Sequence, residues 1–411
     1  MRKRRVVITG LGVIAPNGIG KDAFWKALKE GKSGIRKVTR FDTSGYPSQV
    51  AGEVNDFDPT DYMSPKTARR IDRFSQFGLA CTKMALKDAG LILDTENPNQ
   101  VGIAVGSSVG GIPFAEQQHS IFLEKGLKRV FPLLSTRLFL GTCANNICIE
   151  TGIRGRCFVI STGCATGVDN IAYAFETIKS GECDIMIAGA MEAPLAPLTY
   201  ASFCLIGVMS RKESRTPRPF DKYRDGIVLS EGGAILVLED IKHALKRGAH
   251  IYAEVAGYGT THDAFHLTQP SPDGKQAERA IKLALKHAEL QPEDISYINA
   301  HGCGTPLNDK IETNIIKNVF GKHAFQIPIS SIESMIGHPL GASSAIKIVA
   351  CALSIANGVI PPTINYEYPD PDCDLDYVPK KGRKSNLETV LCNAFSFGGK
   401  NSILVLKKYK E

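Results

Sequence analysis

Short apolar segments that alternate with helical stretches are the feature that most constrains how this chain folds. Residues 5–13 read as a buried strand that ends in a Gly10-x-Gly12 turn. Residues 252–259 repeat the pattern of a short apolar strand followed by G-x-G. Because further strands and helices alternate after each segment, mainly parallel sheets covered by helices are favoured. We therefore predict two similar α/β halves that meet near residue 250.

The composition is that of an ordinary globular protein. Hydrophobic residues make up 43% and charged residues 22% of the 411 positions. No apolar run approaches the roughly 18–20 residues that span a bilayer, and the apolar segment after the basic start is too short for a signal peptide. The net charge of +7 is mild and spread out. We expect a cytoplasmic protein that binds no membrane and no nucleic acid, and for which an acidic protein partner is plausible.

Eleven cysteines are present, and no two of them form a CxxC pair. Most lie among apolar or small residues, where cysteine behaves as a small hydrophobic side chain. This pattern favours a reducing compartment and one special thiol over a disulfide framework or a zinc site. No metal is expected.

Cys164 is the candidate for that thiol. It lies in the segment STGCATG at residues 161–167, between a strand-like run at 156–161 and a helical spacing of apolar residues that begins at Val168. Unpaired N–H groups at the start of a helix favour a thiolate. The alternative is a buried structural cysteine. Position at a glycine-rich turn favours the nucleophile.

Two histidines lie in similar glycine-rich settings. His301 follows the strand-like run 295–300, at the end of a strand where ligand and catalytic groups gather in α/β sheets. His338 follows the run 327–331 and precedes the small residues of 341–345. Either histidine alone is compatible with a hydrogen-bonded structural role. Together with Cys164 they indicate a thiol nucleophile that works with two imidazoles.

Such a set suits thioester chemistry. Acyl transfer to a thiolate needs hydrogen-bond donors for the oxyanion of the tetrahedral intermediate. The Cys164 N–H is one candidate, and the turn at 393–399 offers another. Decarboxylation of a malonyl thioester supplies the carbanion equivalent for carbon–carbon bond formation, and two imidazoles can stabilise the enolate oxygen. This chemistry needs no metal and no organic cofactor.

At these motifs the chain resembles, nearly end to end, the β-ketoacyl-acyl carrier protein synthases of the elongating Cys-His-His class. The resemblance includes residues 6–13, 218–226, 370–379 and 397–399. It implies an α/β, thiolase-like fold in which two pseudo-duplicated halves form a layered αβαβα architecture, normally dimeric. The implied halves are 1–253, which carries the cysteine, and 254–411, which carries both histidines.

Several segments are more similar to the ketosynthase (KS-alpha) subunit of type II polyketide synthases. They are residues 48–51, 70–76, 161–164, 257–259 and 265–268. The implied function is decarboxylative Claisen condensation of an acyl-enzyme thioester with malonyl-acyl carrier protein. The implied partners are the acyl carrier protein, which brings the phosphopantetheine, and either a second copy or a cysteine-less chain-length-factor homologue.

The resemblance also assigns roles to individual residues. Cys164 is the acylated nucleophile, and His301 and His338 bind and decarboxylate the extender. The N–H groups of Cys164 and Phe397 form the oxyanion hole. The implied acyl pocket and gating residues are Val109, Phe395, Phe397, Gly398 and Gly399. The implied carrier-protein docking residues are Lys66, Arg69, Arg70 and Arg211, for which a solvated basic face is the alternative.

One departure from the family pattern is informative. Lysine is usual five residues before the second histidine, where this chain has Glu333, and its glutamate partner is replaced by Lys347. Because the two charges are exchanged, we predict a supporting Glu333–Lys347 ion pair with condensation retained. A carboxylate near His338 would raise the proton affinity of that imidazole. Cys303 and Lys400 are smaller departures whose role the sequence does not reveal.

Three alternatives stay open at this point. The first is a 3-oxoacyl-acyl carrier protein synthase II of fatty-acid elongation. The second is a non-catalytic chain-length or scaffold subunit, against which Cys164 and both histidines argue. The third is a biosynthetic thiolase, which uses a second cysteine near the C-terminus, whereas the turn at 395–399 has none.

Overall fold

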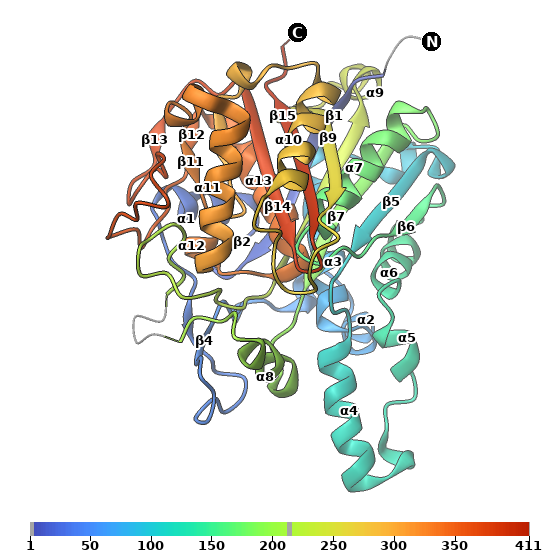
Figure 1. Ribbon diagram of the computed structural model, residues 1–411. Helices are drawn as coiled ribbons and strands as arrows, with labels where there is room; N and C mark the ends of the chain where they lie inside the picture. The colour runs from blue at the N-terminus through green and yellow to red at the C-terminus, as the bar shows by residue number, and fades with distance from the viewer. Residues whose placement is uncertain (1–3, 212–215, 411) are drawn as a thin grey trace.

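The computed structural model describes residues 4–211 and 216–410 as one layered α/β body (Figure 1). One large sheet runs through it, and its two halves have the same strand order. The N-terminal half has the order β6 (Cys157–Val159), β5 (Val101–Gly106), β7 (Ile185–Glu192), β8 (Gly232–Asp240) and β1 (Val6–Ala15). The C-terminal half has the order β11 (Ile329–Ser330), β10 (Tyr297–Asn299), β14 (Thr389–Ser396), β15 (Lys400–Lys407) and β9 (Ala253–His262).

Strand directions repeat between the halves as well. The pairs β1–β8 and β8–β7 are antiparallel, whereas β7–β5 and β5–β6 are parallel. Correspondingly, β9–β15 and β15–β14 are antiparallel, whereas β14–β10 and β10–β11 are parallel. β1 pairs with β9 at only three positions, Val6–Ile8 with Ala253–Val255. The predicted fold of two pseudo-duplicated halves is confirmed, while the boundary at residue 253 stays a prediction.

The expectation of mainly parallel sheets is wrong, because each half is mixed. β14 and β15 show the reason, since only residues 397–399 separate them. A connection this short joins antiparallel neighbours, while parallel neighbours need a crossover of a dozen or more residues. The antiparallel strands lie beside the junction of the two halves, and the parallel ones lie toward the outer edges.

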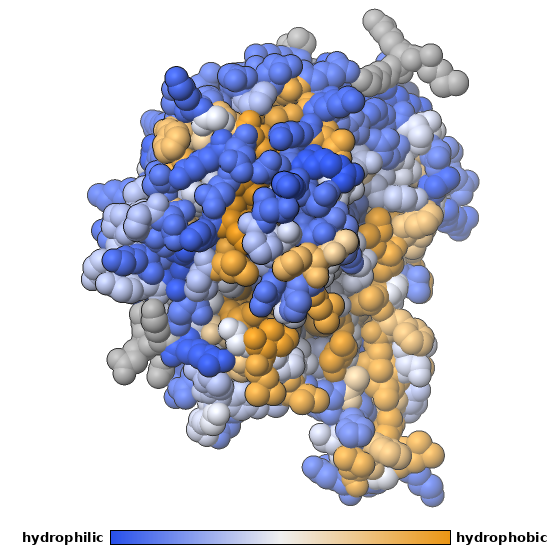
Figure 2. Space-filling view, in the orientation of Figure 1, coloured by the Kyte–Doolittle hydropathy of each residue, from blue (hydrophilic) through white to orange (hydrophobic). Residues whose placement is uncertain are grey.

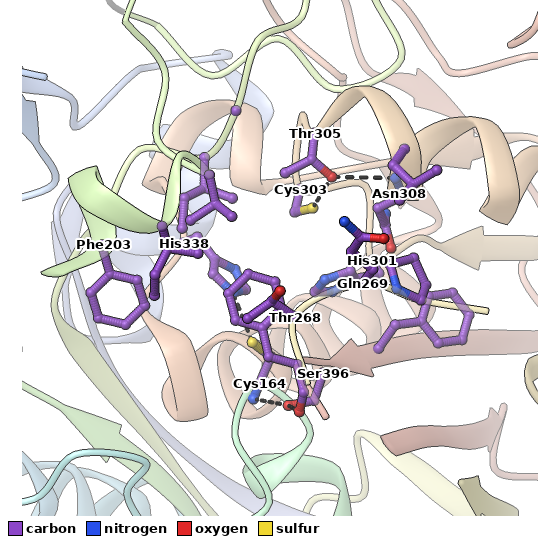
Figure 3. Close-up of a pocket in the computed structure, with 18 of the residues that line it drawn as sticks. Cys164, Phe203, Thr268, Gln269, His301, Cys303, Thr305, Asn308, His338 and Ser396 are labelled. Atoms are coloured by element: carbon purple, nitrogen blue, oxygen red, sulfur yellow. Dashed lines mark hydrogen bonds between the residues drawn. The ribbon is translucent and has the colours of Figure 1, made fainter. Parts of the chain in front are cut away.

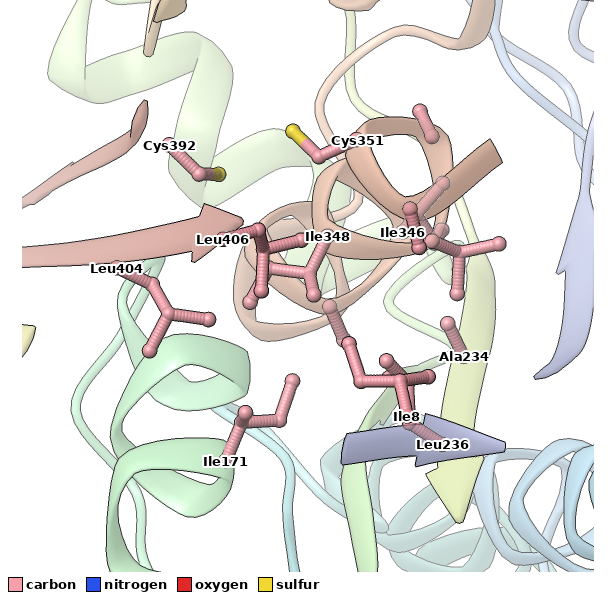
Figure 4. Close-up of a cluster of buried hydrophobic side chains, with 14 of the residues drawn as sticks. Ile8, Ile171, Ala234, Leu236, Ile346, Ile348, Cys351, Cys392, Leu404 and Leu406 are labelled. Atoms are coloured by element: carbon pink, nitrogen blue, oxygen red, sulfur yellow. The ribbon is translucent and has the colours of Figure 1, made fainter. Parts of the chain in front are cut away.

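Helices form three layers around the two half-sheets. α3 (Arg73–Ala89) and α6 (Thr142–Thr151) cover the outer face of the first half, and α10 (Lys275–Ala288) and α11 (Pro306–Phe320) cover that of the second. α7 (Thr166–Lys179) and α13 (Leu340–Asn357) lie between the halves. Figure 4 shows this central layer, where Ile171 and Ile348 meet strand residues of both halves, including Leu236 and Leu404.

α13 is the most deeply buried helix of the central layer, since every residue from Leu340 to Ile355 is buried. It is the one helix in the described ranges that is long and apolar enough to cross a membrane. Because 89% of that window is buried inside the fold, it is a core helix.

The glycines of the two G-x-G segments were predicted to form turns, and that prediction is wrong. They lie in the interior of strands. Gly10 and Gly12 lie within β1, where an added Cβ would lie 2.2 Å from the Ala85 oxygen and 1.9 Å from the Cys81 oxygen of α3. In the same way, a Cβ added at Gly259 of β9 would lie 2.1 Å from the Ala280 oxygen of α10. Glycine inside a strand marks close approach of another backbone. The repeated motif therefore sets how tightly the outer helices pack on the sheet.

The remaining elements surround these layers. They are β2 (Gly18–Ile19), α1 (Lys21–Lys29), β3 (Arg36–Lys37), β4 (Val50–Ala51), α2 (Pro65–Arg70), α4 (Ile112–Lys125), α5 (Leu134–Leu138), α8 (Pro197–Ile206), α9 (Ile241–Lys246), α12 (Glu333–Ile336), β12 (Val359–Ile360) and β13 (Arg383–Lys384). In Figure 1, α4 and α5 project away from the body beside α8.

Gly167 at the crossing of α7 and α13 gives a stability prediction. A Cβ at this position would lie 2.3 Å from the Ala345 backbone nitrogen. We expect Gly167→Ala to lower the free energy of unfolding by about 1–3 kcal/mol, because two buried helices must separate. Denaturant unfolding measures this effect. The matched control is Gly141→Ala, since Gly141 has no atom within 4 Å of an added Cβ. Equal stability of the two variants would contradict the prediction.

Candidate active site

Cys164 lies in the turn that leads into α7. Gly163 has a positive φ of 63°, and Thr166 fixes the turn by accepting from the Thr162 N–H and donating to the Gly163 carbonyl oxygen. The first N–H groups of α7 are satisfied from α13, because Ser344 Oγ accepts from Gly167 and Val168. This arrangement leaves the thiol partly exposed at the start of the helix.

His338 follows α12, and its imidazole bridges two functional groups. Its Nε2 lies 3.0 Å from Cys164 Sγ, and its Nδ1 lies 2.8 Å from Glu333 Oε2. The backbone fixes the residue, because its N–H donates to the Val228 carbonyl oxygen at 2.7 Å. His338 is 4% exposed and Glu333 is 1% exposed, so both residues are almost fully removed from bulk solvent.

These contacts change the charge of His338. Burial lowers the pKa of the imidazole, but the Glu333 carboxylate and the Cys164 sulfur more than offset this and raise the pKa to about 10. Since this folded-state value lies above the ordinary 6.5, the bound proton stabilises the fold fully below pH 6.5. That contribution is lost as the pH rises through about 10.

His301 lies directly after β10 in a tight backbone segment. Glu312 of α11 accepts hydrogen bonds from the N–H groups of His301 and Gly302, both at 2.8 Å, and Asn393 donates to the same carboxylate. Burial and the nearby charges of Lys347 and His338 hold the pKa of the His301 imidazole well below its usual range. His301 is therefore neutral at physiological pH. Within the described ranges, its Nδ1 is buried without a hydrogen-bond partner.

The three predicted side chains line one cavity of about 380 Å³ (Figure 3). The His301 and His338 ring centroids are 5.4 Å apart, and the rings are nearly perpendicular. Phe395 and Phe397 line the same cavity, as do apolar residues of the α8 region such as Phe203 and Ile206. Segments remote in the sequence thus meet at one site, with a sulfur and two imidazoles facing a largely apolar space.

Ser396 is a site residue that the sequence reasoning did not single out. Its hydroxyl oxygen accepts from the Cys164 N–H at 3.0 Å, so this predicted oxyanion-hole donor is already occupied. A substrate oxyanion bound at that N–H has to displace the hydroxyl. The signal lay in the sequence, because Ser396 stands between Phe395 and Phe397 in the turn that was expected to supply the second donor.

The predicted Glu333–Lys347 ion pair is wrong. No salt bridge joins the two side chains in the part of the chain that the structure describes. Glu333 binds His338 and Ser343 instead. Lys347 donates to the carbonyl oxygens of Asn393 at 2.6 Å and Ala300 at 3.3 Å, on the His301 side of the site. The cause is that α12 places the carboxylate beside the imidazole five residues later, while α13 directs the lysine toward Ala300, just after β10, and Asn393, within β14.

The predicted gating residues separate into two groups. Phe395 and Phe397 line the cavity, and Gly398 and Gly399, both with positive φ, continue their turn. Val109 is not among the cavity-lining residues that the structure describes. It packs against the apolar cluster that contains Leu340, which does line the cavity. Val109 therefore packs behind the residues that line the cavity.

The predicted docking residues are exposed but lie on two segments. Lys66, Arg69 and Arg70 are on α2. Arg211 lies at the rim of the cavity, where its N–H donates to Asp225, itself a lining residue. The predicted docking residues therefore form two separate groups. Three lie on the basic helix α2, and Arg211 lies at the cavity mouth.

The two unexplained departures now have locations. Cys303 lines the cavity, but burial and the charges of Asp309 and Glu333 raise the pKa of its thiol well above the ordinary value. It is therefore no rival to Cys164 as a nucleophile. Lys400 begins β15 near Asp169 of α7. Burial raises the pKa of Asp169, and the Lys400 charge opposes part of that rise.

A thiol beside an imidazole, with a second imidazole and an apolar cavity next to them, is the arrangement of an enzyme that transfers acyl groups through a thioester. The chain matches the Beta-ketoacyl synthase, N-terminal domain, over residues 3–244 and the Beta-ketoacyl synthase, C-terminal domain, over residues 252–367. It belongs to the β-ketoacyl synthase family and is an acyltransferase.

Relatives of two kinds are similar over the whole chain. A 3-oxoacyl-[acyl-carrier-protein] synthase 2 of Synechocystis sp. is 44% identical over 413 residues, which cover 100% of this chain and 99% of the relative. The tetracenomycin polyketide synthase ketoacyl synthase alpha subunit of Streptomyces glaucescens is 43% identical over 419 residues, with 100% and 98% covered.

Solved structures of ketosynthases are also similar to this chain over nearly its whole length. One is a type II polyketide synthase acyl-carrier protein in complex with its ketosynthase bound to the hexaketide, with a TM-score of 0.92, 39% identity and both chains fully covered. Another is the ishigamide ketosynthase/chain length factor, with a TM-score of 0.93 and 37% identity over 99% of this chain and 100% of that chain.

Proposed function

We propose that this chain is the catalytic ketosynthase subunit of a type II polyketide synthase. It condenses an acyl group on Cys164 with malonyl-acyl carrier protein, with loss of carbon dioxide. The observation that carries this proposal is the 3.0 Å contact between Cys164 Sγ and His338 Nε2 in a cavity that His301 also lines. The phosphopantetheine thioester enters this cavity on the carrier protein, and the reaction takes place in the cytoplasm.

The proposed reaction has two stages, acylation of Cys164 and condensation with the extender. The thiolate of Cys164 takes the acyl group, and the carbonyl oxygen develops negative charge beside the Cys164 N–H. The imidazoles of His301 and His338 then hold the thioester oxygen of the extender. Decarboxylation breaks the carbon–carbon bond of the malonyl carboxylate, and the resulting enolate attacks the acyl carbon. Preorganised donors of this kind stabilise the developing charge more than the ground state.

An apolar edge of the molecule supports a dimer. Among the described strands, β6 has β5 as its one neighbour in the sheet, and its Phe158 is 42% exposed. Figure 2 shows apolar side chains gathered over this edge and the projecting α4–α6 region. The exposed apolar residues of the region include Phe122, Leu123, Leu127, Phe139 and Ile149. An open strand edge and a contiguous apolar patch both favour association with another chain.

Carrier-protein docking is proposed at the basic residues. Arg211 at the cavity rim and Lys66, Arg69 and Arg70 on α2 offer positive charge to an acidic partner. Such charges steer association more than they add to affinity.

Fatty-acid elongation is the second candidate function, because the Synechocystis relative named for it is as similar to this chain as the polyketide relatives are.

Co-expression tests the polyketide proposal. The chain is expressed with a candidate cysteine-less homologue and supplied with malonyl-acyl carrier protein. We expect a heterodimer whose carrier-protein products have undergone several extensions, as read by intact-protein mass spectrometry. A homodimer that extends fatty acyl-carrier protein, and gains nothing from the homologue, would contradict the polyketide proposal and support fatty-acid elongation.

A further inference from the structure

We propose that Glu333 is a positioning residue that holds Cys164 and His338 as a thiolate–imidazolium pair in the resting enzyme. The site is then a Cys-His-Glu triad with His301 beside it. The inference rests on the proposed function for the identity of the acyl donor. The charge pair itself does not depend on which pathway the enzyme serves.

The hydrogen-bond geometry fixes where the protons lie. An ionised carboxylate only accepts hydrogen bonds, so the 2.8 Å contact with Glu333 places a proton on His338 Nδ1. One more proton is shared between His338 Nε2 and Cys164 Sγ, which are 3.0 Å apart. A carboxylate behind an imidazole stabilises the imidazolium, as the third member does in triads of nucleophile, base and acid. The proton is therefore held on Nε2, and the sulfur carries the negative charge.

The carboxylate of Glu333 is itself held in place. Ser343 Oγ donates to Oε1 at 2.5 Å, and the Glu333 N–H donates to Ser331 Oγ at 3.3 Å. With the carboxylate 1% exposed, its attraction to the imidazolium is weakly screened.

The surrounding charges give the imidazoles of His301 and His338 different protonation states. Cys164 and Glu333 contact the His338 imidazole, and the His301 ring faces it. The other titratable groups of the site are Lys347 and Glu312 on the His301 side, Cys303 on the cavity wall, and Glu192, which accepts from the Gly341 N–H in the helix after His338. Lys347 bonds to carbonyl oxygens on the His301 side, where burial and, second to it, the Lys347 charge lower the pKa of that imidazole and keep it neutral. Glu333 lies on the His338 side, where it favours the cation. With a carboxylate at position 333 and a lysine at position 347, His338 is a cation and His301 is neutral.

The proton balance follows from this pair. The Cys164 thiolate attacks the acyl thioester, so that the bond from Sγ to the acyl carbon forms and the bond to the donor sulfur breaks. The leaving thiolate takes the proton from His338 Nε2, and the imidazole regains a proton from solvent. In the condensation, the enolate displaces Cys164 from the acyl carbon. The sulfur leaves as a thiolate beside an imidazolium, which restores the resting pair without a further proton.

Alkylation of Cys164 by iodoacetamide as a function of pH tests this inference without carrier protein. The assay follows the Cys164 peptide by mass spectrometry, because Cys157 is exposed and Cys148 is partly exposed. We expect wild type to react at a nearly constant rate between about pH 6 and 9, because the thiolate is already present. We expect Glu333→Gln to react at least about tenfold more slowly near pH 6.5. The midpoint, which is the pH at which the alkylation rate reaches half its maximum, should rise by about one pH unit or more.

Two further variants separate positioning from packing. Glu333→Asp keeps the charge, so its midpoint lies nearer wild type than that of Glu333→Gln. Glu312→Gln removes a buried carboxylate that, among the described residues, contacts the His301 and Gly302 N–H groups and the Asn393 amide but no imidazole nitrogen, so it leaves the midpoint in place. The inference is overturned if Glu312→Gln shifts the midpoint as much as Glu333→Gln. It is also overturned if the wild-type rate rises with pH like that of an ordinary thiol, a result that needs no variant to fold.

Discussion

Replacing Cys164 by alanine abolishes acyl transfer and condensation together, with a loss of turnover of at least about 10⁴-fold expected. The reason is that Sγ is the atom that takes the acyl group, and it lies 3.0 Å from the imidazole that activates it. The other cavity thiol, Cys303, has a pKa raised well above the ordinary value by burial and adjacent carboxylates, so it does not replace Cys164. The measurement is product formation from acyl- and malonyl-carrier protein.

The control for this loss is Cys157→Ala, since Cys157 is exposed at the edge of the sheet and outside the cavity. We expect it to keep turnover within about threefold of wild type, because it removes one sulfur atom at the edge proposed to face a second chain and leaves the cavity unchanged. Turnover of Cys164→Ala within about tenfold of wild type would mean that the nucleophile is another group.

Removing His301 separates the two half-reactions. We expect His301→Ala to lower condensation about 10²–10³-fold, the usual effect of losing one preorganised donor. Acylation of Cys164 stays within about tenfold of wild type, because it is the His338 imidazole that contacts the sulfur. His338→Ala, in contrast, slows both steps. Single-turnover experiments measure acyl-enzyme formation by intact mass and condensation by product.

The exposed His119 on α4 supplies the control for general effects of histidine loss. His119→Ala is expected to leave both half-reactions unchanged. If His301→Ala slowed acylation as strongly as condensation, the distinct tasks of the two imidazoles would be contradicted.

The convergence of Cys164, His301 and His338 could be predicted because each marks the end of an apolar run at a glycine-rich turn. The strands before these residues lie toward opposite edges of the sheet, and the packing of α7 against α13 between the halves brings Cys164 and His338 together. The structure brings the three side chains to one cavity. Their catalytic roles stay predictions, which the variants above test.

The partners of buried charges could not be predicted from spacing. The sequence shows that positions 333 and 347 carry exchanged charges, but not which neighbour each side chain faces. That depends on the directions of α12 and α13, which place Glu333 on His338 and Lys347 on backbone carbonyl oxygens. Ser396 was missed for the same reason, because its contact with the Cys164 N–H spans 232 positions. The G-x-G strands were misread as turns because close backbone approach and a tight turn both require glycine.

Stepwise loading and discharge of the enzyme tests the central claim most directly. The protein is incubated with an acyl-carrier protein, and its peptides are weighed before and after malonyl-carrier protein is added. The acyl mass is expected on the Cys164 peptide. It should disappear on addition of the extender as a β-ketoacyl product two carbons longer appears on the carrier protein with release of carbon dioxide. An acyl group on a different residue, or one that the extender does not discharge, would contradict the account.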